Sequence, residues 1–323
     1  MVKEDIEMGA GKTLDFIKPI YVLLYHPWVD GFEEYFAVHL SWLKRNEFES
    51  IPLEGLMQYL KGEEVRIPER PIAITLDDGT IEDYTIAYPL LKKYGFIGTV
   101  FAPTADKYIK FSRKDWWKEV EREGVLRIEG HSHTHALTFI NDCVDDFYVE
   151  RKETREPIIK GLDLKSGAPI FGMGYELISR RFIPHQEFID ICLNYVRKQG
   201  DGFLKKEHWK AELMDLVSKH NADRGRFETE EEKGRRIKEE LELSRTIIEE
   251  AVDNGKKVHF FAYPFGAYDS YLMEYMKHAG YTGAFTTNPG GNVKGDNPYL
   301  LKRMMILNQD SFGGLGSILA EYL

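Results

Sequence analysis

The sequence predicts an α/β protein built on a parallel β-sheet, with one large inserted segment. Short apolar runs alternate with stretches whose apolar residues recur at helical spacing, which is typical of strands joined by helices. Polar motifs follow directly after several of these apolar runs, as expected of an active site at the carboxyl ends of parallel strands. The chain has 323 residues, of which 43% are hydrophobic, and this fits one large α/β domain or two smaller ones.

The elements before the insertion follow one another in a regular order. An apolar run at 20–25 predicts a first strand, which ends at His26 and Pro27. Glycine follows the last apolar residue of several amphipathic stretches, where it commonly ends a helix. Up to residue 135 the sequence predicts helices at 32–46, 50–62, 83–95 and 112–124, and strands at 71–80, 96–103 and 126–135.

Residues 139–229 interrupt this alternation. The segment is rich in charged residues and contains a stretch with glycine and proline at 165–176 and an amphipathic stretch at 188–200. We therefore interpret it as a large, mainly helical insertion within a single domain that spans residues 1–323. Beyond it the alternation resumes, with helices at 230–255, 269–280 and 311–323 and strands at 257–269, 281–287 and 299–307. The charge run at 230–242 is expected to be a solvated helix face.

Charge and apolar content exclude several classes of partner. The 43 Lys and Arg residues against 53 Asp and Glu give a net charge of -10, which argues against nucleic acid or an anionic membrane surface as the main partner. The longest apolar stretches are far shorter than the roughly 20 residues that cross a bilayer. The first residues include acids and do not resemble a signal peptide, so we expect a cytoplasmic protein. Cys143 and Cys192 lack metal-site spacing and are expected to be free thiols.

Two adjacent carboxylates end the strand at 71–80. Consecutive side chains at the end of a strand point in different directions, so Asp77 and Asp78 are able to serve different tasks, one binding a metal and the other facing substrate. Asp-Asp-Gly is also common in turns. Taken alone, the pair is better explained as a turn.

Three histidines lie within five residues at the end of the strand at 126–135. His131 and His135 are near enough in sequence to share one metal ion, and neutral imidazole is a common ligand of zinc. A solvated polar loop is the alternative, but the run is internal and is framed by apolar strand residues. Ser132 stands where zinc proteases with an HExxH motif carry a glutamate base, so the base must come from elsewhere.

Three motifs together resemble a known family. A strand ending in Leu-Asp-Asp-Gly at 76–79, a later one ending in His-Ser-x-x-His at 131–135, and a third ending in Tyr-Pro-Phe-Gly at 263–266 are similar to the leading motifs of the polysaccharide deacetylases. This is carbohydrate esterase family 4, with its NodB-like homology domain. The resemblance covers most of the chain outside the insertion. It implies a distorted (β/α) barrel of about seven strands that holds a divalent ion in a groove open to sugar polymers.

The resemblance also implies a role for each motif residue. By position, Asp77 is the general base, Asp78, His131 and His135 are the metal ligands, and the backbone N–H of Phe265 stabilises the oxyanion. Such a site suits Zn²⁺ best, with Co²⁺, Ni²⁺ or Fe²⁺ as alternatives, and the ion would activate water and polarise an N-acetyl carbonyl. Tyr263, in the same loop, and His185, in the insertion, are further candidates for substrate contacts.

Two features of the family are missing. Ala262 stands where many members carry an arginine that orients the base; Arg303 is a candidate to replace it, although an ordinary salt bridge explains that residue equally well. The late Leu-x-x-His motif that supplies the general acid has no equivalent, so the proton donor is unassigned. His133 and His185 are candidates, each more simply explained as a surface histidine. His26, after the first strand, is expected at the same face and is as readily structural as functional.

Several aromatic residues could stack on sugar rings. They are Trp116, Trp117, Tyr175 and Trp209. Aromatic residues at such spacings more often belong to a hydrophobic core, so none of them is assigned to the site.

The sequence therefore predicts a metal-dependent hydrolase that removes N-acetyl groups from an amino-sugar-containing glycan, with carbohydrate as its partner. Within the enzyme class, the alternative is hydrolysis of another non-peptide carbon–nitrogen bond, in a formyl group or a ring amide. The rival from another class is a sugar-binding relative that has lost catalysis. The absent arginine and acid favour that rival, whereas the complete set of base and ligands opposes it. The natural substrate, the metal and the oligomeric state are left open.

Overall fold

Seven strands form one curled sheet in the computed structural model, which describes residues 18–105, 115–150, 164–200, 202–220, 223–253, 255–306 and 312–323. The strand order is β11-β10-β5-β4-β3-β1-β12, and each neighbouring pair is parallel. The bounds are β1 Tyr21–Tyr25, β3 Pro71–Asp77, β4 Gly98–Ala102, β5 Leu126–Gly130, β10 Phe260–Ala262, β11 Gly283–Phe285 and β12 Met304–Met305, and the short β2, Glu49–Ser50, pairs with β3. This curled half-barrel confirms the predicted distorted (β/α) barrel.

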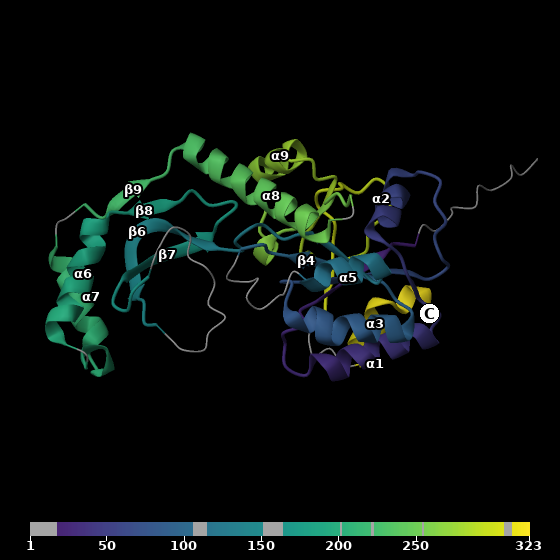
Figure 1. The fold of residues 1–323 in the computed structure, drawn as a ribbon, viewed down its shortest axis with the longest axis horizontal. Coiled ribbons are helices and arrows are strands. Elements are labelled where there is room, and N and C mark those ends of the chain that lie inside the picture. The colour runs from purple at the N-terminus through teal and green to yellow at the C-terminus, as the bar shows by residue number, and fades with distance from the viewer. Residues whose placement is uncertain are drawn as a thin grey trace, which may run out of the picture.

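Helices cover the outer face of the curled sheet (Figure 1). They are α1 Phe32–Arg45, α3 Tyr88–Tyr94 with the π-helical turn η1 Asp83–Ala87 before it, α5 Asp115–Glu123, α8 Glu230–Val252, α9 Ser270–His278 and α10 Phe312–Ile318. Helix α2, Leu53–Lys61, instead packs against the opposite face of the sheet. Side chains alternate between the two faces of each strand. Leu23 and Ile74 belong to the core under the helices, whereas Val22 and Ala73 belong to a second core on the other face. Both faces are therefore buried, as is usual for parallel sheets.

The two edges of the sheet approach each other through the segment before β12. Phe285, the last residue of β11, forms a parallel bridge with Leu301. The N–H of Thr286 donates to the carbonyl of Leu301 at 2.8 Å. This curl brings Arg303, the residue before β12, into the interior next to β3.

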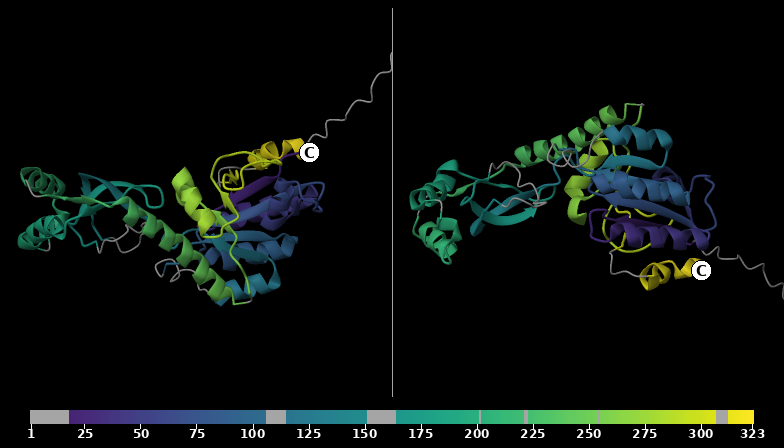
Figure 2. Two further views of the ribbon diagram at one scale, coloured as in Figure 1. Left: turned by 90° about the horizontal axis from the view of Figure 1, so that it is seen from above. Right: turned by 60° about the horizontal axis from the view of Figure 1, so that its bottom comes forward.

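The residues described between 137 and 227 form an arm that projects from the barrel (Figures 1 and 2). The arm contains the antiparallel pairs β6 Leu137–Phe147 with β7 Pro169–Tyr175 and β8 Phe182–Pro184 with β9 Gly225–Phe227, and the helices α6 Gln186–Gln199 and α7 Trp209–Lys219. Phe139, Phe171 and Leu213 are part of its own hydrophobic core. Helix α8 runs from the arm back to the barrel, where it contacts α5 and β5.

The amphipathic stretch at 188–200 forms α6, and the insertion contains the helices α6 and α7 together with the four strands β6 to β9. Its long strand β7 coincides with the glycine- and proline-containing stretch at 165–176, which was not predicted to form a strand. A Cβ atom at Gly172 would lie 2.2 Å from Asn141 Nδ2, and one at Gly174 would lie 2.7 Å from Ile140 Cγ2. Glycine is therefore needed where β6 side chains cross β7, and it conceals the alternation that marks a strand.

Three further predictions concern membrane spans, cysteines and cellular location. None of the helices in the described part of the chain is long and apolar enough to cross a bilayer. Cys143 and Cys192 are free thiols, as predicted. Residues 1–17, on which the prediction of a cytoplasmic location depends, lie outside the described residues.

Candidate metal and catalytic site

Asp78, His131 and His135 come together at the carboxyl ends of β3 and β5. One potential ligand atom from each lies within 4.8 Å of the others. The Asp78 Oδ1 atom is 3.6 Å from the Nε2 atoms of both histidines. A carboxylate oxygen and two imidazole nitrogens at this spacing fit a divalent ion such as Zn²⁺ and leave coordination positions open.

Hydrogen bonding, burial and neighbouring charges set the protonation of the two histidines. His131 Nδ1 lies 2.8 Å from the carbonyl oxygen of Ala262. Because a carbonyl only accepts, Nδ1 carries a proton, and Nε2 is the nitrogen of His131 that faces Asp78 and is able to bind a metal in the neutral ring. Burial lowers the pKa of His131, but the neighbouring carboxylates of Asp77 and Asp78 leave that pKa above its ordinary value. Burial, followed by the charge of His131, lowers the pKa of His135 to about 4, so its imidazole is neutral at pH 7.

Left-handed backbone conformations are concentrated in the three motifs. Asp78 has a φ of 81°, Ser132 of 64°, His135 of 46° and Phe265 of 58°. Of the non-glycine residues that the structure describes with positive φ, these are four out of six. Each such conformation costs roughly 1–2 kcal/mol and persists only where surrounding contacts enforce it, which is characteristic of functional sites.

Asp77 is held by a buried arginine from the far edge of the sheet. Arg303 donates from its two terminal nitrogens to Oδ1 and Oδ2 of Asp77, both at 2.7 Å. The arginine side chain is fully buried and its Nε donates to the carbonyl of Thr286 at 2.9 Å. Burial alone would raise the pKa of Asp77, but the charges of Arg303 and then of His131 leave that pKa below its ordinary value. Arg303 therefore occupies the role left vacant at Ala262, as a guanidinium against the predicted base.

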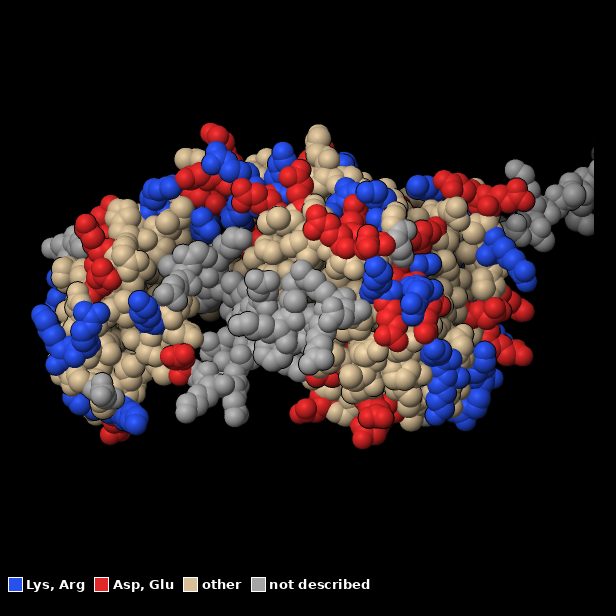
Figure 3. All heavy atoms as spheres, in the orientation of Figure 1, with Lys and Arg blue, Asp and Glu red and all other residues tan. Residues whose placement is uncertain are grey.

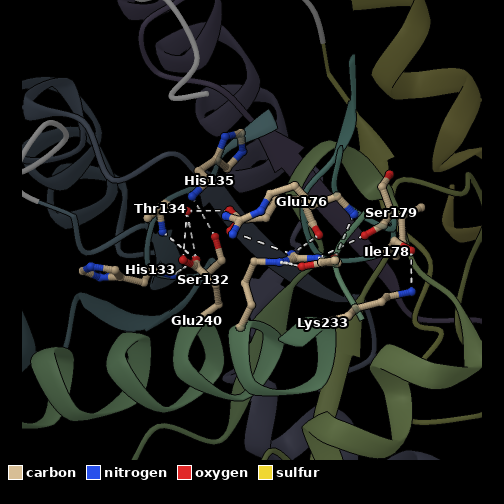
Figure 4. A network of polar contacts seen from close by, with 12 residues as sticks. Ser132, His133, Thr134, His135, Glu176, Ile178, Ser179, Lys233 and Glu240 are labelled. Carbon is tan, nitrogen blue, oxygen red and sulfur yellow. Dashed lines mark hydrogen bonds and ion pairs between the residues drawn. The ribbon is translucent and has the colours of Figure 1, made fainter. Parts of the chain in front are cut away.

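Helix α8 supports the backbone of the histidine loop (Figure 4). Glu240 Oε2 accepts from the N–H groups of His133 at 3.1 Å and Thr134 at 2.8 Å. The Thr134 hydroxyl lies 3.0 Å from both Glu240 oxygens and 2.7 Å from Glu176 Oε2, where Glu176 directly follows β7. One turn earlier in α8, Arg236 donates to the carbonyl of Glu176. The charge run at 230–242 is therefore not simply a solvated face, because Arg236 and Glu240 are buried.

The two histidines considered as proton donors are not in the ligand cluster. His133 Nδ1 lies 2.9 Å from the Thr104 hydroxyl, and its ring points away from His135 (Figure 4). His185 lies at the start of α6 in the arm, with Nδ1 3.8 Å from the carboxylate of Asp223.

Two residues of the loop after β10 have different surroundings. Tyr263 is fully buried and its hydroxyl donates to the carbonyl of Tyr299 at 3.0 Å, and a substrate contact by this side chain stays a prediction. Its ring packs on that of Phe261, which lies two residues earlier in the chain and therefore on the same face of the sheet. Phe265, in the short helix η3 Pro264–Gly266, is exposed, and its ring centroid lies 4.5 Å from that of His135.

The segment after β1 adds residues that sequence reasoning left open or missed. Trp28 donates from Nε1 to Asp78 Oδ2 at 2.5 Å, and its ring lies 5.7 Å from that of His26. Burial raises the pKa of Asp77 and of Asp78, and neighbouring charged groups lower it. The charge of His26 is one of these lowering influences on both residues, and a smaller one than that of His131. The signal for both residues is their position directly after a strand of the same parallel sheet.

Comparisons with known proteins agree on one family. The family model described as polysaccharide deacetylase matches residues 64–162 and 216–284. Poly-beta-1,6-N-acetyl-D-glucosamine N-deacetylase of Staphylococcus aureus is 31% identical over 215 residues, which cover 53% of this chain and 72% of that protein. YxkH of Bacillus subtilis is 30% identical over 123 residues, 35% of this chain and 42% of YxkH, so the match spans less than half of that relative.

Two solved structures share the fold. The BpsB deacetylase domain from Bordetella bronchiseptica aligns with a TM-score of 0.61 and 17% identity, over 89% of this chain and 95% of that one. IcaB from Ammonifex degensii aligns with a TM-score of 0.57 and 16% identity, over 93% of this chain and 97% of that one.

Proposed function

We propose that this chain, which belongs to the polysaccharide deacetylase family, is a metal-dependent hydrolase that removes N-acetyl groups from an amino-sugar-containing glycan. The observation that carries the proposal is the three-ligand cluster of Asp78, His131 and His135 next to a second carboxylate, Asp77, that is held ionised. A binding protein has no use for a base beside a metal site.

Asp78, His131 and His135 would hold the ion. The chemistry that a bound divalent ion would supply is polarisation of the acetyl carbonyl and acidification of the attacking water. The carbonyl of Ala262 fixes the proton of His131 on Nδ1, and Trp28 orients the carboxylate of Asp78.

Asp77 is the proposed general base. One of its oxygens takes the proton of the attacking water as the carbon–oxygen bond forms, and Arg303 keeps the carboxylate charged and oriented before that step. The backbone N–H of Phe265 is the proposed donor to the oxyanion, and its left-handed φ of 58° gives that loop its unusual course.

His26 is the candidate for the proton that the leaving amine requires. It follows β1, at the same edge of the sheet as the ligands, and its charge acts on both Asp77 and Asp78. A proton from His26 to the amide nitrogen allows the carbon–nitrogen bond to break, and the products are acetate and a free amino sugar.

The substrate class rests on the family and on the named relative. The Staphylococcus aureus relative acts on poly-β-1,6-N-acetyl-D-glucosamine, and we propose β-linked N-acetylglucosamine chains as the substrate class here. On the face shown in Figure 3, acidic and basic side chains of the described residues are interspersed over barrel and arm. Together with the net charge of -10, this favours a neutral chain over a polyanion.

The test is release of acetate by the purified protein from β-1,4- and β-1,6-linked N-acetylglucosamine oligomers. The assay is run after treatment with a chelator and again after zinc is added back, with Cys143→Ser as a control far from the site. Release that requires the metal supports the proposal. Bound zinc without acetate release, but with hydrolysis of a formyl or ring amide, would transfer the same chemistry to another substrate, and no hydrolysis at all would favour a binding protein.

A further inference from the structure

An exposed aromatic side chain of the arm lies beside the candidate metal site. Tyr175, the last residue of β7, is 43% exposed. Its ring stacks on that of Phe265, with centroids 5.1 Å apart and planes at 25°. Phe265 in turn contacts the ring of His135, one of the proposed metal ligands, at 4.5 Å. Three rings therefore lead from the metal site to the arm.

Contacts on both sides of Tyr175 fix its position relative to the histidine loop. Strand β6 begins at Leu137, two residues after His135, and Leu137 is the register partner of Tyr175. The next residue, Glu176, donates its N–H to the carbonyl of Ala136 at 3.3 Å and accepts the hydroxyl proton of Thr134 at 2.7 Å (Figure 4). The tyrosine ring is thus tied to the same short segment that carries the ligands.

The sequence offered four aromatic residues as candidates for sugar stacking, and the structure separates them. Trp116 and Trp117 are buried in the main core. Trp209 packs against Phe147 in the core of the arm. Only the ring of Tyr175, among these four, is both exposed and in contact with the site.

An exposed ring at this position needs an explanation. Leaving a large aromatic side chain in water forfeits the free energy of burial, and the free face of such a ring suits the apolar face of a sugar. The phenolic hydroxyl adds a group that can bond to a sugar hydroxyl. Ligand sites in general combine aromatic walls with a few placed polar groups.

We propose that Tyr175 is a sugar-binding residue whose ring stacks on a pyranose next to the one that loses its acetyl group. The arm then supplies a subsite that a single sugar cannot reach, and the enzyme prefers oligomers. This inference rests on the proposed function, because it assumes that the metal site acts on a glycan.

The test compares Tyr175→Ala and Tyr175→Phe in steady-state acetate release from N-acetylglucosamine oligomers of increasing length. We expect Tyr175→Ala to raise KM for the longer oligomers by about 3- to 10-fold and to reduce their advantage over the shortest substrate. Tyr175→Phe keeps the stacking face and should retain most of that advantage. Phe227→Ala is the matched control, because Phe227 is an arm aromatic of similar exposure, 42%, on β9.

Direct binding separates this inference from the proposed function. Calorimetric titration with the longest oligomer, of zinc-loaded proteins that also carry Asp77→Asn, measures binding at the subsite with turnover suppressed. Weaker binding in Tyr175→Ala than in Phe227→Ala supports the subsite even if the wild-type protein releases no acetate. Equal binding by the two variants, or a kcat loss in Tyr175→Ala that is the same at every chain length, overturns it, because the ring then only supports Phe265.

Discussion

Replacing Arg303 with methionine removes the charge that keeps Asp77 ionised. Arg303 is 0% exposed and Asp77 3%, and two charge-assisted hydrogen bonds of 2.7 Å join them. Removal of one partner from a buried pair leaves the other charge uncompensated and costs about 3–5 kcal/mol. We expect a loss of this size in the free energy of unfolding at neutral pH.

The loss should depend on pH in a defined direction. In the wild type the pKa of Asp77 lies below its ordinary value, so the pair contributes stability above the pKa of the unfolded chain, about 3.9, and loses it as the pH falls through the folded pKa. In Arg303→Met burial is no longer opposed by the guanidinium, and the pKa of Asp77 rises. The difference in unfolding free energy between the two proteins therefore shrinks as the pH is lowered. The acidic limb of the pH–activity profile moves toward neutral pH, since the base must be ionised.

Denaturant unfolding of the chelated proteins between about pH 4 and pH 8, together with the pH profile of acetate release, measures both effects. Arg127→Met is the control. Arg127 is 46% exposed and pairs with Glu121 at 2.8 Å, but Glu121 also has Lys256 at 2.9 Å, so this change should cost about 1 kcal/mol or less. If Arg303→Met loses the same unfolding free energy at both ends of the pH range, and the acidic limb of its pH–activity profile does not move, then Arg303 does not keep Asp77 ionised.

Three further predictions concern the loop, the acid and the turn after β3. Glu240→Ala leaves two N–H groups of the histidine loop without their acceptor and should weaken zinc binding about 10–100-fold in a chelator competition. Glu240→Gln keeps one carbonyl oxygen as an acceptor and should lose less zinc affinity. Equal zinc affinities in both variants and the wild type would contradict this prediction. His26→Gln should lower kcat while zinc stoichiometry stays at the wild-type value, and an unchanged kcat would assign the acid elsewhere. Gly79→Ala places a Cβ 2.7 Å from that of Ala102, at a residue with a φ of 60°. The control is Gly62→Ala, where φ is 73° and nothing lies within 4 Å of the added Cβ. Denaturant unfolding should show a loss of unfolding free energy about 1–3 kcal/mol larger for Gly79→Ala than for Gly62→Ala, and similar losses would mean that the loop relaxes freely.

The local motifs could be predicted because they sit at the ends of strands. Asp77 and Asp78 end β3, and His131 and His135 follow β5, which is separated from β3 only by β4 in the sheet. Parallel strands place their carboxyl ends at one edge, so both motifs could be predicted to lie near the same site. The assignment of Asp78, His131 and His135 as one ligand set came from the family resemblance. The carbonyl of Ala262 on a third strand, β10, sets the tautomer of His131, so the tautomer could not be predicted from the sequence.

Contacts between distant segments could not be established from the sequence pattern, which named Arg303 only as one candidate partner for the base. Arg303 and Asp77 are 226 residues apart in the sequence, and the curl of the sheet brings them into contact. The charges of α8 looked like a solvated face because helical periodicity does not tell which polar face meets a loop. Arg236 and Glu240 are buried there because the histidine loop and the end of β7 offer them backbone donors and acceptors.

Asp77 and Asp78 are adjacent carboxylates with different proposed roles, Asp77 as the base and Asp78 as a metal ligand. Asp77→Asn and Asp78→Asn are compared with the wild type for zinc stoichiometry and for acetate release from the same oligomer. The account predicts that Asp77→Asn binds zinc at the wild-type stoichiometry and releases acetate about 10²–10⁴-fold more slowly, whereas Asp78→Asn loses the zinc. Full acetate release by Asp77→Asn, or loss of zinc from Asp77→Asn but not from Asp78→Asn, would contradict it.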